Sequence, residues 1–371
     1  MARVWYLGAS YRVDLPKDAP VQERLKATGG NTGNLIIGHS LMRQLKIDAF
    51  GEGVTADAGF VEQNFDYVVI GASNFLYQKF DFPRTAAFLE KVRLPCVIIG
   101  LGAQAPDYGH RIRLLDSTIR MMKVISERST SLGVRGHFTA SVLERLGIRN
   151  IRVIGCPSIY WRCRPAMFIS RRPFDQCSRI AVNGHSNIID FTNDISSARR
   201  VQRLLAVLAF ENRYPYILQS EMPEISIACG EEPQLDDSTI SWMKSNQGLS
   251  DIPDEEFFQY VKTNMVTFFD VEEWMAYMRS FDFVIGSRFH GCLAAILNGI
   301  PATMFLHDAR TRELGELLRM PQVDIRKVKR IDLRALYESM DLDTLEATYS
   351  SLYDSYIDFL EENKIEHGLE R

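Results

Sequence analysis

The stretch FVIGSRFHGCLAAILNGIPATMFLHDARTRE, residues 283–313, decides the predicted fold. An apolar run at 283–285 is followed by charged residues, an apolar helix is predicted over 292–297, and a second apolar run at 302–306 again precedes charged residues. The pattern predicts a strand, a loop, a helix and a second strand. Ligands of open α/β sheets bind outside the carboxyl ends of the strands. Arginines and a histidine at that place indicate a small, multiply charged anion with proton transfer beside it.

The rest of the chain continues this alternation of short apolar runs and helical segments, which predicts parallel sheets covered on both faces. We expect an α/β protein with two Rossmann-like domains in a GT-B-like arrangement, with a cleft between them. The domains are predicted at residues 1–172 and 173–340, and a C-terminal helix in 341–371 is expected to pack back on the first domain. The same helix would also suit a dimer or a membrane-associated partner. Residues 221–262 are acidic and ambiguous.

The composition limits the classes of protein to which the chain could belong. The 371 residues are 46% hydrophobic and carry a net charge of -4, so no global basic field predicts nucleic-acid binding. The N-terminus lacks the apolar core of a signal peptide, and no apolar run approaches the ~20 residues of a membrane span. The six cysteines form no CxxC pair. We therefore expect a cytoplasmic protein without a transmembrane segment.

Arg288 and His290 are the first candidate site residues. Arginine offers a fork of N–H donors that matches carboxylate or phosphate oxygens, and histidine exchanges a proton near neutral pH. Two positions apart in an extended segment, both would face one pocket while Phe289 packs inward. The alternative is a buried ion pair beside a core histidine. The neighbouring Ser287 and Gly291 complete this candidate segment.

The segment Gly29–Asn34 is the most Gly/Asn-rich in the chain. Its backbone N–H groups, with the start of the following helix, would cradle a phosphate. No Gly-Lys-Ser/Thr follows, so it is not a P-loop; a tight turn is the alternative. The candidates that it supplies are Asn31, Thr32, Gly33 and Asn34.

Other candidates follow predicted strands: Asn74, Gln104, Arg135, His185, Asp308 and Arg310. Asp308 could orient His290 while Arg310 binds the anion, or Asp308 could cap a helix whose charged first turn is exposed. For Arg135 the alternative is a charge on the surface of the protein. For His185 the alternative is a loop histidine without a role in the site. No HxxxH, HExxH or DxD-type pattern stands in a convincing context, so no metal site is predicted.

Four segments together resemble the polysaccharide pyruvyl transferase family. They are GGNTGNLIIGHSL at 29–41, VRGHFTASVLERLGI at 134–148, VIGCPS at 153–158, and GSRFHGCLAAILNGIPA through DARTREL at 286–314. The last segment is the most specific, and residues 190–265 carry no motif of the family.

The resemblance implies a GT-B-like fold and transfer of a pyruvyl group from phosphoenolpyruvate to a sugar, usually as a cyclic ketal. Arg288 and His290 match the family's arginine and histidine in the phosphoenolpyruvate site. It also implies that the second domain holds phosphoenolpyruvate and the first the acceptor. No cofactor is expected, since phosphoenolpyruvate is the donor substrate.

In the hypothesis that follows, Arg288 clamps phosphoenolpyruvate and His290 acts as general acid. The competing hypotheses are a GT-B glycosyltransferase with a nucleotide sugar in the same crevice, and a non-catalytic carbohydrate- or anion-binding protein. The expected partners are phosphoenolpyruvate and a saccharide acceptor; a second copy of the chain is a further candidate partner. A lipid-linked acceptor would place the protein at the inner face of the membrane.

Overall fold

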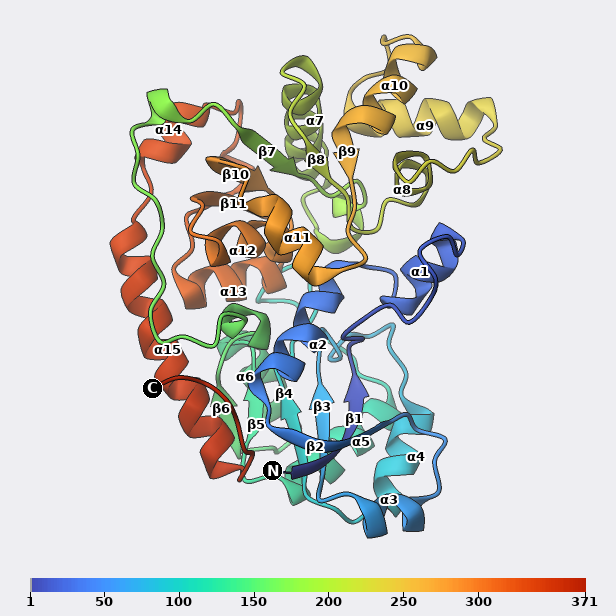
Figure 1. Cartoon of the computed structure of the whole chain (residues 1–371), viewed down its shortest axis with the longest axis vertical. Coiled ribbons are helices and arrows are strands. Elements are labelled where there is room, and N and C mark those ends of the chain that lie inside the picture. The colour runs from blue at the N-terminus through green and yellow to red at the C-terminus, as the bar shows by residue number, and fades with distance from the viewer. Residues whose placement is uncertain (1) are drawn as a thin grey trace.

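The computed structural model describes residues 2–371, which form two α/β halves one above the other (Figure 1). The first sheet has the strand order β2-β1-β3-β4, and an isolated parallel bridge between Leu101 and Val134 continues it into β5 and β6. Its strands are β1 (Ala2–Gly8), β2 (Ile47–Glu52), β3 (Tyr67–Gly71), β4 (Cys96–Ile99), β5 (Leu132–Val134) and β6 (Ile151–Val153). All pairings are parallel, and the order reverses between β1 and β3.

The second sheet has six parallel strands in the order β12-β11-β10-β7-β8-β9. Its strands are β7 (Ile180–Asn183), β8 (Tyr216–Ile217), β9 (Met265–Val266), β10 (Phe283–Gly286), β11 (Ala302–Leu306) and β12 (Gln322–Asp324). Counted from β7, this is the Rossmann order 3-2-1-4-5-6 read from the other edge. The order reverses between β7 and β10, so a ligand is expected at the carboxyl ends of these two strands.

Helices cover both sheets. Those of the first half are α1 (Val21–Ala27), α2 (Gly33–Gln44), α3 (Ala58–Asn64), α4 (Pro83–Lys91), α5 (Asp116–Arg128) and α6 (His137–Glu144). The second half holds α7 (Ile195–Glu211), α8 (Met222–Ala228), α9 (Asp237–Gln247), α10 (Asp254–Asn264), α11 (Val271–Met278), α12 (Phe289–Leu297), α13 (Ala309–Leu318), α14 (Leu333–Glu338) and α15 (Leu342–Glu362). Short 3₁₀ helices are η1 (Pro157–Tyr160), η2 (Phe174–Gln176), η3 (Ile188–Phe191) and η4 (Ile325–Lys327). Within residues 2–371, every helix is too short or too polar to cross a membrane.

Local sequence explains many helix starts. Seven of the α-helices begin after an aspartate whose carboxylate accepts a backbone N–H from the first turn. This bond satisfies a donor that the helix itself leaves free. The capping residues are Asp57, Asp194, Asp236, Asp270, Asp308, Asp332 and Asp341. At each of these helices, a single aspartate in the sequence therefore marks where the helix begins.

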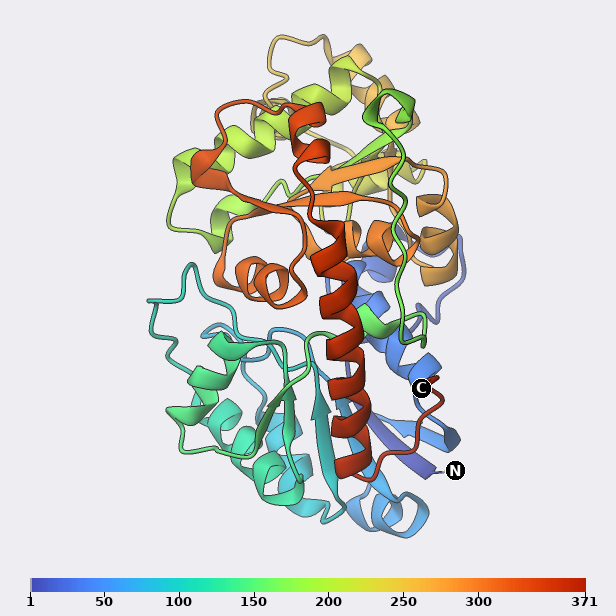
Figure 2. The same ribbon diagram turned by 90° about the vertical axis from the view of Figure 1, so that its left-hand side faces the viewer.

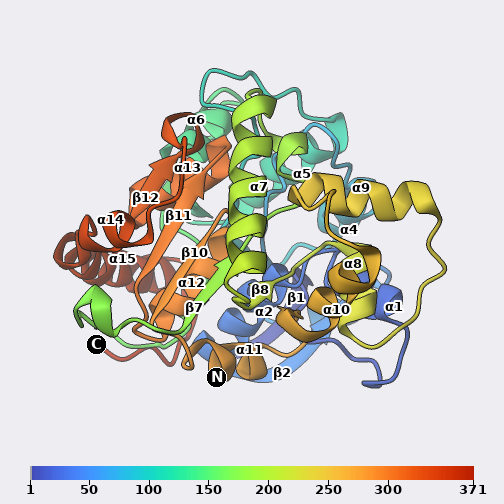
Figure 3. The same cartoon turned by 90° about the horizontal axis from the view of Figure 1, so that it is seen from above.

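The predicted α/β class with two Rossmann-like sheets in a GT-B-like arrangement is confirmed, but several details differ from expectation. Strand β12 was not predicted, because it is only three residues long and lies in a charged part of the chain. Strand β2 was not predicted, because its residues alternate between partly and fully exposed at the edge of the sheet and form no apolar run. The ambiguous residues 221–262 form α8, α9 and α10, which lie together on the side of the second sheet where β8 stands (Figure 3). The domain boundaries at 172 and 340 stay predictions.

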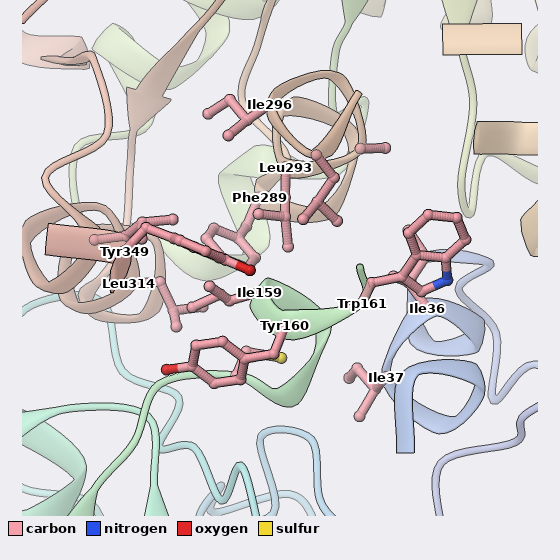
Figure 4. Close-up of a cluster of buried hydrophobic side chains, with 14 of the residues drawn as sticks. Ile36, Ile37, Ile159, Tyr160, Trp161, Phe289, Leu293, Ile296, Leu314 and Tyr349 are labelled. Carbon is pink, nitrogen blue, oxygen red and sulfur yellow. The ribbon is translucent and has the colours of Figure 1, made fainter. Parts of the chain in front are cut away.

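An apolar junction joins the two halves. Figure 4 shows Phe289 and Leu293 of α12 pointing toward Ile159 of η1, with Ile36 and Ile37 of α2 on the other side. These side chains are almost fully buried and belong to one core cluster that draws on both sheets. Burial of apolar surface is the main favourable contribution to folding. The junction therefore holds the carboxyl ends of the two sheets against each other.

Helix α15 runs along both halves (Figure 2). Its Tyr356 ring stacks on Tyr160 of η1 with ring centroids 4.4 Å apart, and the Tyr356 hydroxyl donates to Gln44 Oε1 at 2.8 Å. Near its N-terminus, Glu346 accepts hydrogen bonds from Arg171 in the segment between the sheets. Helix α1 comes from the first half of the chain but packs on the second half, since its Val21 and Leu25 side chains join the core of the second sheet. The chain thus links the two halves in both directions.

Gly291 lets α12 rest directly on the end of β7. A Cβ atom added to Gly291 would stand 0.9 Å from Asn183 Nδ2, an overlap that no rotation of that buried side chain readily relieves. Asn183 in turn accepts a hydrogen bond from Gln219 Nε2 at 3.2 Å. The close approach of α12 therefore requires glycine at this position.

We predict that Gly291→Ala lowers the free energy of unfolding by roughly 1–3 kcal/mol or more, because overpacking displaces Asn183 and α12. Denaturant unfolding measures the loss. Gly59→Ala on α3 is the matched control, since its new Cβ would meet only the Asp57 side chain, at 3.1 Å, and alanine favours a helix. Equal stability of Gly291→Ala and wild type would contradict this account of the α12 contact.

Candidate active site

A cavity of about 260 Å³ lies where the carboxyl ends of the two sheets meet. Both halves contribute to its wall, and the switch point between β7 and β10 forms part of it. Nine of the predicted site residues line it: Asn31, Asn34, Asn74, Gln104, Arg135, His185, Arg288, His290 and Arg310. Six predicted residues lie outside its lining: Thr32, Gly33, Ser287, Phe289, Gly291 and Asp308. The tertiary structure thus brings together polar groups that are scattered over most of the chain.

Arg288 precedes the first turn of α12 at the end of β10, and only 4% of it is exposed. Its Nε donates to the Gly184 carbonyl at 3.1 Å, and its Nη2 donates to Ser220 Oγ at 2.6 Å and to the Glu221 carboxylate. One edge of the guanidinium fork is therefore occupied by the protein. Arg288 lines the cavity with its remaining N–H groups, and the expectation that it clamps an anion stays a prediction.

Glu221 is the buried counter-ion of Arg288. Its carboxylate also accepts backbone N–H groups from Gln219 at 2.8 Å and Ser220 at 2.9 Å, and more weakly from Ser186 at 3.3 Å. Burial alone would raise the pKa of Glu221, but Arg288 and these N–H groups hold it below its ordinary value. The carboxylate is therefore charged and fixes the position of Arg288.

His290 faces the cavity from the first turn of α12 and is partly exposed to it. Burial, followed by the charges of Arg135 and Arg310, holds the pKa of His290 well below its ordinary value, so the imidazole is neutral near pH 7. Its Nε2 lies 3.8 Å from Cys156 Sγ. A Cβ added to Gly33 would stand 3.1 Å from His290 Nδ1. The absence of a side chain at Gly33 therefore leaves room for the His290 ring.

Arg135 and Arg310 complete the positive charge of the cavity. Arg135 is 2% exposed, and its guanidinium donates to the Gly100 carbonyl at 2.9 Å and to Asn74 Oδ1 at 2.7 Å. It is a buried cavity residue and not a surface charge. Burial lowers the pKa of Arg310, and its arginine neighbours act in the same direction, yet a guanidinium stays protonated at neutral pH. Within residues 2–371, Arg310 Nε has no hydrogen-bond partner.

Asp308 has a different role from the one expected. It caps α13: its carboxylate accepts the Thr311 backbone N–H at 2.7 Å, and it also accepts Gln104 Nε2 at 2.9 Å. Its Oδ2 lies 3.6 Å from Arg310 Nε. The carboxylate therefore positions Gln104 and Arg310, and the expectation that it orients His290 is wrong.

The Gly/Asn-rich segment before α2 does not form a backbone cradle for phosphate. The N–H groups of Thr32, Gly33 and Asn34 donate to Gln219 O, Asn31 Oδ1 and Asn31 O, respectively. Because these donors are satisfied within the protein, the segment meets the cavity through the side chains of Asn31 and Asn34. Thr32 is fully buried.

His185 faces the cavity beside a second histidine that follows β11. The rings of His185 and His307 meet edge to face with centroids 5.8 Å apart. Burial, then Arg288, His307 and Arg310, hold the pKa of His185 well below its ordinary value. Burial also lowers the pKa of His307. Both rings are therefore neutral near pH 7, while the cavity keeps its three arginine charges.

Several contributors were missed from the sequence. Glu221 and Ser220 belong to the region without a recognised motif, and their only signal is a polar run after the short strand β8. Asn187, Asp190 and Phe191 line the cavity from η3, and Tyr77 and Phe80 line it from the loop after β3. No group of three or more His, Cys, Asp or Glu side chains within residues 2–371 is arranged to hold a metal ion.

Fold and site together define the class of the protein: a two-sheet, GT-B-like α/β protein with a cationic cavity between the sheets. The model of the family described as polysaccharide pyruvyl transferase matches residues 10–309. The chain therefore belongs to the polysaccharide pyruvyl transferase family. No curated protein matches the chain.

Three of the solved structures with a similar chain path are the following. The S. aureus MnaA–UDP co-structure has a TM-score of 0.44 at 9% identity and covers 99% of this chain and 100% of its own. For UDP-N-acetylglucosamine 2-epimerase from Rickettsia bellii the values are 0.44, 12%, 97% and 96%. The Methanocaldococcus jannaschii UDP-GlcNAc 2-epimerase, in complex with UDP-GlcNAc and UDP, gives 0.44, 12%, 97% and 99%. At this similarity they carry no argument about what this chain binds.

We predict that Glu221→Ala lowers the free energy of unfolding by about 3–5 kcal/mol, because it leaves the Arg288 charge buried and unpaired. Denaturant unfolding measures the change. Glu256→Ala is the matched control, since Glu256 pairs with Arg213 at 2.9 Å on the surface and such pairs contribute at most about 1 kcal/mol. Similar losses for the two variants would refute the role of Glu221 as buried counter-ion.

Glu313 of α13 is buried at the contact with α6, and not exposed as expected. Its carboxylate accepts the backbone N–H and the hydroxyl of Thr139 at 2.7 and 2.8 Å. Burial nevertheless raises the pKa of Glu313 to about 7. A raised pKa in the folded state means that folding favours the protonated form, so its contribution is full below about 4.5 and is lost as pH rises through about 7.

We therefore predict that Glu313→Gln flattens the decline in stability between pH 5 and 8, an interval that follows from the two pKa values. The melting temperature across this range, relative to wild type, measures the effect. Glu144→Gln, an exposed carboxyl on α6, is the control and should follow wild type. A wild-type slope in Glu313→Gln would show that this group is not the titrating one.

Proposed function

We propose that the protein transfers a pyruvyl group from phosphoenolpyruvate to a sugar of a glycan or glycan precursor, forming a pyruvate ketal and releasing phosphate. The observation that carries the proposal is the small cavity into which Arg135, Arg288 and Arg310 converge beside His290. Phosphoenolpyruvate bears a carboxylate and a phosphate close together, so it calls for several cationic donors within one small space. Membership of the family supports the same reaction.

The three arginines divide the binding of the anion. Arg310 offers a guanidinium whose Nε makes no hydrogen bond within the part of the chain that the structure describes, so it is the main candidate for a two-pronged contact. Arg288 and Arg135 are held by the protein and supply fixed positive charge, which costs no reorganisation when substrate arrives. Gln104 and Asn74 add neutral hydrogen-bonding groups. The arrangement favours an anion over a neutral sugar at this position.

His290 supplies the proton. A phosphoenolpyruvate anion beside the neutral imidazole raises the pKa of His290 and favours uptake of a proton. The imidazolium then protonates the methylene carbon, which becomes the methyl group, and C2 becomes electrophilic. A sugar hydroxyl adds to C2 and returns its proton to His290. A second hydroxyl displaces phosphate from C2, its proton leaves with the phosphate, and the ketal ring closes.

The cavity also bears on the competing hypotheses. Its volume of about 260 Å³ is below the usual range for drug-sized ligands, and a nucleotide sugar is at least that large. A histidine with a lowered pKa among three arginines suits proton transfer next to an anion better than simple retention of one. Both points favour pyruvyl transfer over a glycosyltransferase or a binding protein.

We predict acceptor-dependent phosphate release from phosphoenolpyruvate, reduced about 10²- to 10⁴-fold in His290→Ala through loss of the general acid. Purified protein is assayed against a panel of sugar acceptors, with His110→Ala as control because His110 lies outside the cavity lining. Near-normal turnover by His290→Ala would remove its catalytic role. No release with any acceptor, together with thermal stabilisation by a nucleotide sugar but not by phosphoenolpyruvate, would favour glycosyl transfer.

A further inference from the structure

A second cavity, of about 990 Å³, opens in the first half of the molecule. It lies at the carboxyl ends of β1 and β3, where the order of the first sheet reverses, and Ser10 and Ser73 line it just beyond these strands. Such switch points are ligand positions in open α/β sheets. Gly29, Asn34, Ser73 and Phe80 line both cavities, so the two spaces share a wall. A ligand in the second cavity therefore borders the anion site.

The charges of the two cavities differ. Three arginines face the anion cavity, with Asp190 as the only carboxylate among its lining residues. The charged residues that line the second cavity are Glu52, Asp81 and Lys79, all of them exposed. A phosphate there would meet two carboxylates for one ammonium group, and like charges repel. The second cavity therefore suits a ligand without phosphate.

An aromatic side chain stands at the shared wall. Phe80 is 40% exposed, and its ring meets Tyr77 and Phe82 edge to face at centroid distances of 5.3 and 6.2 Å. The loop is held in place because Thr118 Oγ1 donates to the Phe80 carbonyl at 3.2 Å and the Phe82 N–H donates to Ser117 Oγ at 3.1 Å. A fixed, exposed aromatic face between two cavities is a surface for an apolar ligand face.

We propose that the second cavity binds the acceptor as an uncharged saccharide, with one sugar ring lying on Phe80. The C–H face of a pyranose matches the electron-rich face of the aromatic ring, while its hydroxyls extend past the shared wall toward the anion cavity. The volume exceeds what a single ring fills, so it leaves room for a second sugar residue. The inference rests on the proposed function, and it places any phosphate linkage of the acceptor outside both cavities.

The test is binding of the full chain to an array of neutral oligosaccharides and their sialylated and phosphorylated counterparts, with phosphoenolpyruvate present. Phe80→Ala removes the aromatic face, and Thr85→Trp adds bulk at a position that lines the second cavity and not the first. Phe60→Ala is the matched control, because Phe60 is 52% exposed on α3 and lines neither cavity. Thermal stabilisation by phosphoenolpyruvate is measured in parallel for each protein.

We expect wild type and Phe60→Ala to retain neutral oligosaccharides, and Phe80→Ala and Thr85→Trp to bind them at least tenfold more weakly. Thr85→Trp should keep the stabilisation by phosphoenolpyruvate. Unchanged saccharide binding by both variants, a preference for phosphorylated glycans, or no binding of any neutral glycan would overturn the inference. Saccharide binding that depends on Phe80, without stabilisation by phosphoenolpyruvate or phosphate release, would instead overturn the proposed function and leave the saccharide site standing.

Discussion

The packing of α12 against α2 and η1 is the contact on which the rest of the structure depends. Phe289 enters the apolar junction, and Gly291 allows the helix to touch the end of β7. The same turn carries Arg288 and His290, so one short segment both joins the halves and supplies the site. Burial of the apolar side places the polar side in the cavity, because adjacent helix residues point in different directions. The packing of α12 in the junction therefore also fixes the positions of Arg288 and His290 in the cavity.

The positive charge that makes the cavity suited to an anion also destabilises the folded protein. The three guanidinium groups repel one another, and among them Arg288 has the shortest ion pair, with the buried carboxylate of Glu221. Arg135 is held by neutral oxygens, and Arg310 lies 3.6 Å from Asp308. Burial, together with the charges of Arg135 and Arg310, lowers the pKa of His290 and keeps its ring neutral. A multiply charged anion relieves the repulsion among the arginines, so binding and protonation of the histidine are coupled. The neighbouring cavity has one lysine and no arginine among its lining residues, so the positive charge is concentrated in the smaller cavity.

Much of the site was predictable because of where its residues stand in the chain. In a parallel sheet every residue that directly follows a strand reaches the same edge, so Asn74, Gln104, Arg135, His185 and Arg288 were expected together. Side-chain roles were harder to predict. Asp308 had two local interpretations, and the sequence offers no information on whether its carboxylate turns toward the helix or toward His290. The donors of the glycine-rich segment were likewise satisfied by groups that sequence reading does not pair with them.

The sequence by itself determined the α/β class, the position of most strands and the polar character of their carboxyl ends, because buried strands, caps and turns are local patterns. It did not determine which arginine is free to bind. That depends on Glu221, which stands 67 residues from Arg288 and meets it only when β8 and β10 join the same sheet. The burial of Glu313 and the contact between the two cavities also arise only when the halves pack together. Long-range pairing of charges and shared walls are properties of tertiary structure, since no local pattern specifies the partner.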